Sequence, residues 1–181
     1  MTVSLDFPAS AKRISSADQR YGEVLDFLID EAAVLDQRDL NSWLGYLDPS
    51  LVYLAPVRET RLNVDGEGVA SGYSHFDETY GSLAFKVKRL LDPMAWSENP
   101  GSRTRRMISN LRAFELADGE IGAITNLVVF RNRGDDTHFD IISCQRTDSL
   151  RRAEGGSFRL ARRIILFDQA TLNTPNLAIF L

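Results

Sequence analysis

The second half of the chain contains four long strand-like segments separated by three short glycine-containing turns, and this pattern constrains the fold more than any other feature. The turns are expected at 117–120, 133–136 and 154–157, and the first has the Asp-Gly pair typical of a β-hairpin. The strands are expected over 103–116, 121–132, 137–150 and 158–168. Long strands joined by tight turns predict an antiparallel meander.

The first half of the chain has helical patterns. Apolar residues recur at three- and four-residue spacing over 21–35, which predicts an amphipathic helix, with a capping box at 16–19 before it. A short second helix is expected over 40–47, capped by Asp39 or Asn41 and ended by the Asp-Pro-Ser sequence that follows.

A strand is expected over 51–57, with Pro56 forcing an edge or a bulge near its end. A third helix, with an apolar stripe over 80–91, is expected to be capped at 74–77. Loops are expected at 58–74 and 92–102.

Helices followed by strands predict an α+β fold with the helices on one face of the sheet. Strands this long must curl, because sheets twist. We therefore expect a cone-shaped, curved antiparallel sheet packed with N-terminal helices and enclosing a pocket. The 181 residues are expected to form a single domain (1–181), with an extended N-terminal arm at 1–15.

The chain has too few metal-binding residues for most metal centres. Its one cysteine, Cys144, excludes an internal disulfide, and a Rieske cluster needs two cysteines and two histidines. The two histidines, His75 and His138, lie far apart without a ligand spacing. We expect no metal or cofactor site in this chain.

The net charge of −4 argues against a nucleic-acid partner, because phosphate contacts need a basic surface. No apolar run approaches the roughly 18 residues that a membrane span requires. The N-terminus lacks a secretory pattern, and with a single cysteine the expected location is the cytoplasm.

Some side chains could do acid–base chemistry in a pocket. His138 and Asp140 would share one face of a strand, although their place beside the Gly134 turn favours a solvated hairpin end. His75 is interpreted as a capping or surface residue. The other pocket candidates, which more simply fill sheet positions, are Tyr53, Asn126 and Cys144.

Arginine accounts for 18 of the 21 basic residues, and it clusters on two predicted strands. At the start of 103–116, alternation places Arg103 and Arg105 on one face and Arg106 on the other. Such a strand either frays into solvent or contacts another chain. The alternative is an internal Arg–Asp pairing that stiffens the sheet. The second cluster is Arg159, Arg162 and Arg163.

The last ten residues, 172–181, end in Ile179, Phe180 and Leu181 without a charge. A free tail this apolar would be a liability, so it is expected to pack on its own domain or on a neighbour.

These segments together resemble the small (beta) subunit of bacterial aromatic-ring-hydroxylating dioxygenases. The resemblance runs from about Tyr21 to Leu181, and the order and spacing of its pieces carry it. The matching pieces are Trp43-Leu44, the run from Tyr53 to Arg61, Trp96 ahead of Pro100, Ser102 to Arg105 with Ser109-Asn110, the run from Ala161 to Gln169, and Asn176 to Leu181.

The resemblance implies a fold like that of nuclear transport factor 2 and SnoaL, and a hexamer of three large and three small subunits. It places the Rieske 2Fe-2S cluster and the mononuclear iron in the large (alpha) subunit, with electrons from NAD(P)H, and makes the small subunit structural. On this basis we expect subunit contacts at Arg58, Arg103, Arg105, Asp168 and Gln169. The alternative is a stand-alone isomerase or dehydratase on the same cone, which would need a buried His–Asp pair, or Tyr53 with a buried Asp.

Overall fold

The computed structural model describes residues 5–60, 62, 68–92, 94, 98–174 and 176–181. Its strands are β1 (Lys12–Ile14), β2 (Leu47–Arg58), β3 (Val69–Thr79), β4 (Arg103–Glu115), β5 (Ile121–Asn132), β6 (Asp140–Arg152) and β7 (Phe158–Phe167). Its helices are α1 (Gln19–Asp36), α2 (Leu40–Leu44), α3 (Tyr80–Leu90) and a 3-10 turn at Ala117–Gly119.

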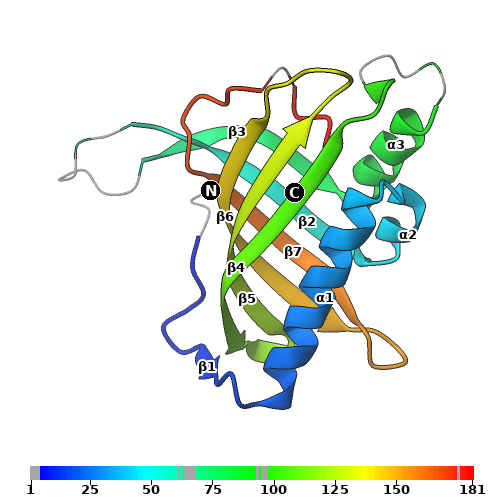
Figure 1. Cartoon of the computed structure of the whole chain (residues 1–181). Helices are drawn as coiled ribbons and strands as arrows, with labels where there is room; N and C mark the ends of the chain where they lie inside the picture. The colour runs from blue at the N-terminus through cyan, green and yellow to red at the C-terminus, as the bar shows by residue number, and fades with distance from the viewer. Residues whose placement is uncertain (1–4, 61, 63–67, 93, 95–97, 175) are drawn as a thin grey trace.

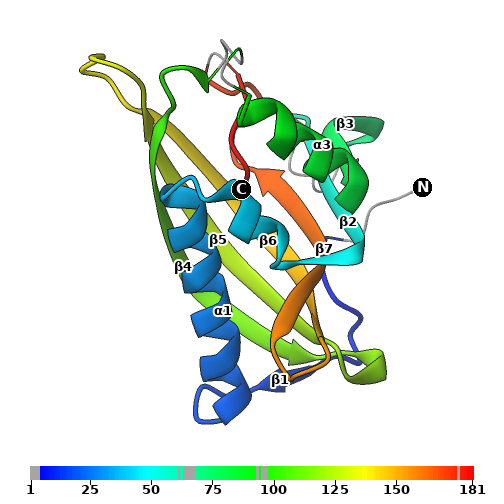
Figure 2. The same cartoon turned by 90° about the vertical axis from the view of Figure 1, so that its right-hand side faces the viewer.

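The strands form one curled sheet in the order β1-β4-β5-β6-β7-β2-β3. The helices lie on its concave side (Figures 1 and 2). Neighbouring strands are antiparallel except β2 and β7, which run parallel. The predicted α+β cone is confirmed, with one parallel pair that the sequence pattern did not indicate.

The meander β4-β5-β6-β7 is confirmed, and its largest boundary shift is at the start of β6. β6 begins at Asp140 rather than at 137. The reason is Asn132, whose side-chain amide donates to the carbonyl oxygens of Asp136 (2.6 Å) and His138 (2.9 Å). These bonds hold the intervening backbone in a loop and keep it out of the ladder.

The segment from 68 to 79 corrects two expectations, because β3 occupies the end of the predicted loop and the whole predicted cap at 74–77. Its residues are mostly small or polar, so the strand is stabilised by pairing with β2 rather than by an apolar pattern of its own. Pro56 lies at a register shift of that pairing, which confirms the predicted bulge. The helix cap is Thr79.

The other helix ends differ by a few residues from the sequence pattern. Asp18 caps α1 by accepting from the backbone N–H of Arg20 (2.9 Å), so the capping box predicted at 16–19 is wrong. Asp39 caps α2, as one of the two alternatives predicted. α2 ends at Leu44, and Leu47 belongs to β2, where it pairs with Leu160 of β7.

The C-terminal tail closes the core. The ring of Phe180 stacks on that of Trp43 with centroids 4.3 Å apart, and both side chains are buried. The Tyr53 hydroxyl donates to the Leu181 carbonyl oxygen (2.7 Å) and accepts from its N–H (2.8 Å). The expectation that the apolar tail is pinned is confirmed, and the tail packs on its own chain.

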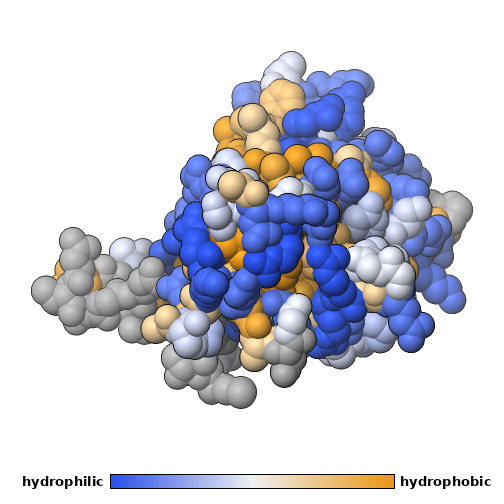
Figure 3. Space-filling model, turned by 90° about the horizontal axis from the view of Figure 1, so that it is seen from below, coloured by the Kyte–Doolittle hydropathy of each residue, from blue (hydrophilic) through white to orange (hydrophobic). Residues whose placement is uncertain are grey.

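The N-terminal segment covers part of the convex face of the sheet. Thr147 donates to the carbonyl oxygen of Leu5 (2.7 Å), and Phe7 packs on Phe114. A Cβ at Gly122 would lie 2.6 Å from the Phe7 ring, so a larger residue there would displace that ring. At the end of the molecule where α1 begins, hydrophilic side chains cover most of the surface (Figure 3).

Candidate functional site

The convex face of β4, β5 and β6 carries exposed apolar residues that nothing in the described chain covers. Arg105 lies opposite Phe130 in the ladder, and Phe130 lies opposite Ile141. Met107 is 57%, Phe139 61% and Ile141 52% exposed. We call Arg105, Met107, Phe130, Phe139 and Ile141 the convex patch.

The arginines at the start of β4 divide as alternation predicts. The Arg105 side chain is exposed and makes no hydrogen bond or ion pair with the described residues, while Arg106 is buried on the opposite face. Arg106 forms an ion pair with Asp36 of α1 and donates to the carbonyl oxygen of Phe180. The internal Arg–Asp pairing therefore exists, but it belongs to Arg106.

Arg103 lies at the border of the convex patch and is tied to its own chain. Its guanidinium donates to the side-chain oxygen of Asn132 (2.6 Å) and to the carbonyl oxygen of Gly134. These bonds link the start of β4 to the loop that follows β5. Arg103 thus orders the hairpin end beside the patch.

The other three predicted contact residues lie where β7 meets β2. The Arg58 Nε donates to the carbonyl oxygen of Phe167 (2.6 Å). Asp168 is exposed and accepts from the Ser143 hydroxyl (2.7 Å), and the side-chain oxygen of Gln169 is buried without a hydrogen-bond partner among the described residues. β5 and β6 separate this group from Arg103 and Arg105, so the five residues form two groups on the sheet.

A buried ion cluster, which the sequence analysis did not anticipate, joins α1 to the concave face. Glu31, Arg146, Asp148 and Arg163 are each at most 1% exposed. Arg163 donates to both oxygens of Glu31 (2.7 and 2.7 Å) and to both oxygens of Asp148 (2.8 and 2.7 Å). Its last donor reaches the Leu181 carbonyl oxygen (2.9 Å), so all five N–H groups of the guanidinium are used.

A sequence signal for this cluster existed in α1. Glu31 lies three residues after Leu28 and four before Leu35, inside the apolar stripe of the helix. A carboxylate in such a stripe requires a buried cation. The sequence does not say which of the adjacent Arg162 and Arg163 provides it, because apolar residues surround both.

The electrostatics of the cluster favour its charged form. Burial alone would raise the pKa of Glu31, but the charge and hydrogen bonds of Arg163, with Arg146 and the Trp43 indole N–H, hold it below its usual value. Burial likewise acts to lower the pKa of Arg163, and the two carboxylates raise it well above its usual value. The cluster is an ion pair network that holds α1 on the sheet, without a group poised for proton transfer.

The two predicted histidines are both exposed and lie in different parts of the molecule. The His138 side chain is 90% exposed, and its Nδ1 lies 3.2 Å from an oxygen of Asp136. His138 and Asp140 line one open pocket at this hairpin end. Asp140 accepts from the Thr174 hydroxyl (3.0 Å). The solvated hairpin end is therefore confirmed for His138. His75 is exposed in β3 with its ring edge-on to Phe167, so of the two alternatives predicted for it the surface residue is confirmed and the helix cap is wrong.

The remaining candidates serve the packing. Burial raises the pKa of the Tyr53 hydroxyl to about 12, and that hydroxyl is already bonded to Leu181. Burial also raises the pKa of the Cys144 thiol to about 12, which opposes thiolate chemistry. Asn126 is exposed on the convex face.

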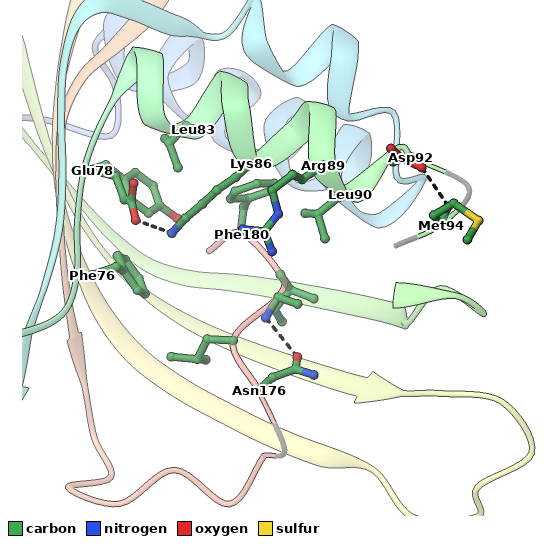
Figure 4. A pocket seen from close by; sticks show the side chains of 14 residues that line it. Phe76, Glu78, Leu83, Lys86, Arg89, Leu90, Asp92, Met94, Asn176 and Phe180 are labelled. Atoms are coloured by element: carbon green, nitrogen blue, oxygen red, sulfur yellow. Dashed lines mark hydrogen bonds and ion pairs between the residues drawn. The ribbon is translucent and has the colours of Figure 1, made fainter. Parts of the chain in front are cut away.

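A cavity of about 570 Å³ opens between α3, β3 and the C-terminal tail (Figure 4). Its lining includes Tyr53 and the ion pair between Glu78 and Lys86, but no histidine among the described residues. Among those same residues, no three His, Cys, Asp or Glu side chains form a group that could hold a metal ion. No helix in the described ranges is long and apolar enough to cross a membrane.

The curled sheet with helices on its concave face defines a class of small α+β cones. A protein from Streptomyces coelicolor, ActVI-ORFA, shares this fold with a TM-score of 0.60 at 18% identity, over 83% of this chain and 98% of that one. A chain of naphthalene 1,2-dioxygenase with indole bound in its active site is closer, with a TM-score of 0.83 at 25% identity over 94% and 90% of the two chains.

Sequence comparison places the chain within this class. It is 34% identical to the benzene 1,2-dioxygenase subunit beta of Pseudomonas putida and 35% identical to the biphenyl 2,3-dioxygenase subunit beta of Rhodococcus jostii (strain RHA1). Each match covers 87% of both chains. A family model described as ring hydroxylating beta subunit matches residues 30–174.

The chain therefore belongs to the family of ring-hydroxylating beta subunits, and the resemblance seen in the sequence is confirmed. It is a structural subunit of an oxidoreductase complex, and the stand-alone isomerase or dehydratase is not favoured. Trp96, one of the residues that carried the resemblance, lies outside the described residues.

Proposed function

We propose that this chain supports the assembly of large alpha subunits that dihydroxylate an aromatic compound, in a cytoplasmic hexamer of three large and three small subunits. The convex patch is the observation that carries the proposal. It combines exposed aromatic, aliphatic and Met side chains with an arginine that has no partner in the described chain. Interfaces are enriched in these residue types.

The five residues predicted from the sequence fit different parts of such a surface. Arg105 provides an unpaired cation within the convex patch, and Asp168 provides an exposed carboxylate at the far border of the same convex face. The side chains of Arg103 and Arg58 donate to backbone carbonyl oxygens of their own chain, so they hold the surface in its shape. Each guanidinium also adds positive charge to that surface. Gln169 lies next to Asp168, but its side-chain oxygen is buried, so this residue lies just behind the surface rather than on it.

The redox groups belong to the partner in this proposal. The large subunit holds the Rieske 2Fe-2S cluster and the mononuclear iron, and receives electrons that originate from NAD(P)H. The relatives differ in their named substrates, which include benzene, biphenyl and N,N-dimethyl phenylurea. In this proposal most of the substrate specificity lies with the large subunit, because that subunit holds the iron.

Co-expression with a ring-hydroxylating large subunit from the same organism tests the proposal. A tag on this chain alone should recover both subunits in equal amounts, and sedimentation should give the mass of the hexamer. Recovery of this chain without a large subunit, at low ionic strength and with both proteins folded, would contradict it.

A further inference from the structure

The cavity between α3, β3 and the tail has the features of a small-molecule site that the assembly role does not use. Its volume of about 570 Å³ lies within the range of roughly 300–1,000 Å³ of ligand pockets. Three aromatic rings contribute to its wall, from Tyr53, Phe76 and Phe180. Tyr53 and Phe76 are stacked with centroids 5.5 Å apart, which fixes their orientation.

Among the described residues, every charged side chain that lines the cavity has a hydrogen-bond or ion-pair partner except Arg89. Glu78 forms an ion pair with Lys86, and Asp92 accepts from the backbone N–H of Met94 (2.8 Å). Arg89 makes no hydrogen bond or ion pair through its side chain with the described residues, and it reaches from α3 over the cavity (Figure 4). The cavity thus presents apolar walls and one unpaired guanidinium.

We propose that this cavity binds a planar aromatic carboxylate, with its ring against the aromatic wall and its carboxylate on Arg89. A guanidinium matches a carboxylate with two parallel hydrogen bonds. One unpaired cation favours a monoanion, because a dianion such as phosphate would also face the carboxylates of Glu78 and Asp92. A flat ring suits a wall that contains aromatic rings better than a flexible aliphatic chain does.

The site is independent of the proposed assembly, since it lies on the concave side of the sheet and the convex patch on the other. Its test therefore uses the full-length chain by itself. A negative result leaves the subunit role untouched, and failure of assembly leaves this site untouched.

Calorimetric titration of the chain with 2-naphthoate is the direct test, with 2-naphthalenemethanol as the uncharged match. We expect saturable binding of one naphthoate per chain, at least about tenfold tighter than the alcohol, because a charge-assisted hydrogen bond contributes that much. Equal affinity for acid and alcohol, or no saturable binding of naphthoate, would overturn the proposal.

Variants of α3 test whether naphthoate binding depends on Arg89 itself or on the general positive charge of the helix. Arg89→Met should weaken naphthoate binding at least about tenfold and leave the alcohol unchanged, while Arg89→Lys should keep part of the preference. Lys88→Met is the matched control, since Lys88 is exposed on the same helix and does not line the cavity. Naphthoate binding that survives in Arg89→Met, or is lost equally in Lys88→Met, would overturn the assignment. Circular dichroism of each variant verifies that α3 is folded.

Discussion

Arginine serves opposite purposes on the two faces of this sheet. On the concave face, Arg163 is fully buried and uses every N–H group on Glu31, Asp148 and Leu181. On the convex face, Arg105 is exposed among apolar side chains and has no partner in the described chain. The same residue type therefore stabilises the fold on one face and remains available for another chain on the other.

This contrast predicts which mutations should damage the fold and which should damage the assembly. A buried ion pair contributes little net stability when complete, but removing one member leaves an unpaired charge in the interior. An exposed, unpartnered cation contributes almost nothing to the fold. Mutations on the two faces should therefore separate folding from association.

The largest effect is expected at Arg163. Arg163→Met leaves Glu31 and Asp148 buried without their main cation, which costs about 3–5 kcal/mol, a large share of the stability of a typical domain. Denaturant unfolding of the isolated chain measures this loss. Arg159→Met on the same strand is the control and should change the free energy of unfolding by about 0.5 kcal/mol or less. An Arg163→Met variant as stable as the wild type would contradict the claim that Arg163 stabilises the fold from the concave face.

The next effect concerns association. Arg103→Ala together with Arg105→Ala should leave a folded chain that binds its large subunit more weakly, by about 2–5 kcal/mol if these arginines pair across the interface. Sedimentation of the mixture measures the affinity, and Arg112→Ala, exposed on the same strand, is the control. A hexamer of unchanged affinity would exclude the interface role. If the double variant were unfolded, these arginines would instead stabilise the fold through contacts within their own chain.

A smaller effect follows from the lowered pKa of Glu31. Its contribution to stability is complete above the unfolded-state pKa near 4.5 and is lost as the pH falls through the lower folded-state pKa. One proton changes the stability by at most about 1.4 kcal/mol per pH unit. Urea unfolding of the chain below pH 4.5 should therefore show a flatter pH dependence in Glu31→Gln than in the wild type. Parallel curves would mean that Glu31 titrates alike in both states.

The smallest effect is expected at His138. Because its side chain is 90% exposed, His138→Ala should leave the turnover of the assembled oxygenase within a few-fold of the wild type. A general acid or base contributes roughly 100- to 10,000-fold. A loss of that size in an intact hexamer would mean that His138 acts as a general acid or base.

The two faces also show what the sequence could and could not predict. The strands from β4 to β7 were predictable because short glycine-containing turns separate long strand-like segments, and the alternation of Arg105 and Arg106 followed directly. β3 was missed because its residues carry no strand pattern and pairing with β2 decides its conformation. The ion cluster was missed because Glu31, Asp148 and Arg163 are far apart in the chain, and only tertiary packing brings them together.

The claim that this chain contributes structure and not redox chemistry is tested most directly by locating the iron. Elemental analysis for iron, with visible absorption, would be made on the chain purified alone and on the complex with its large subunit. We predict no iron and no visible absorption in the isolated chain, and both in the complex. Stoichiometric iron in the isolated chain would contradict the account.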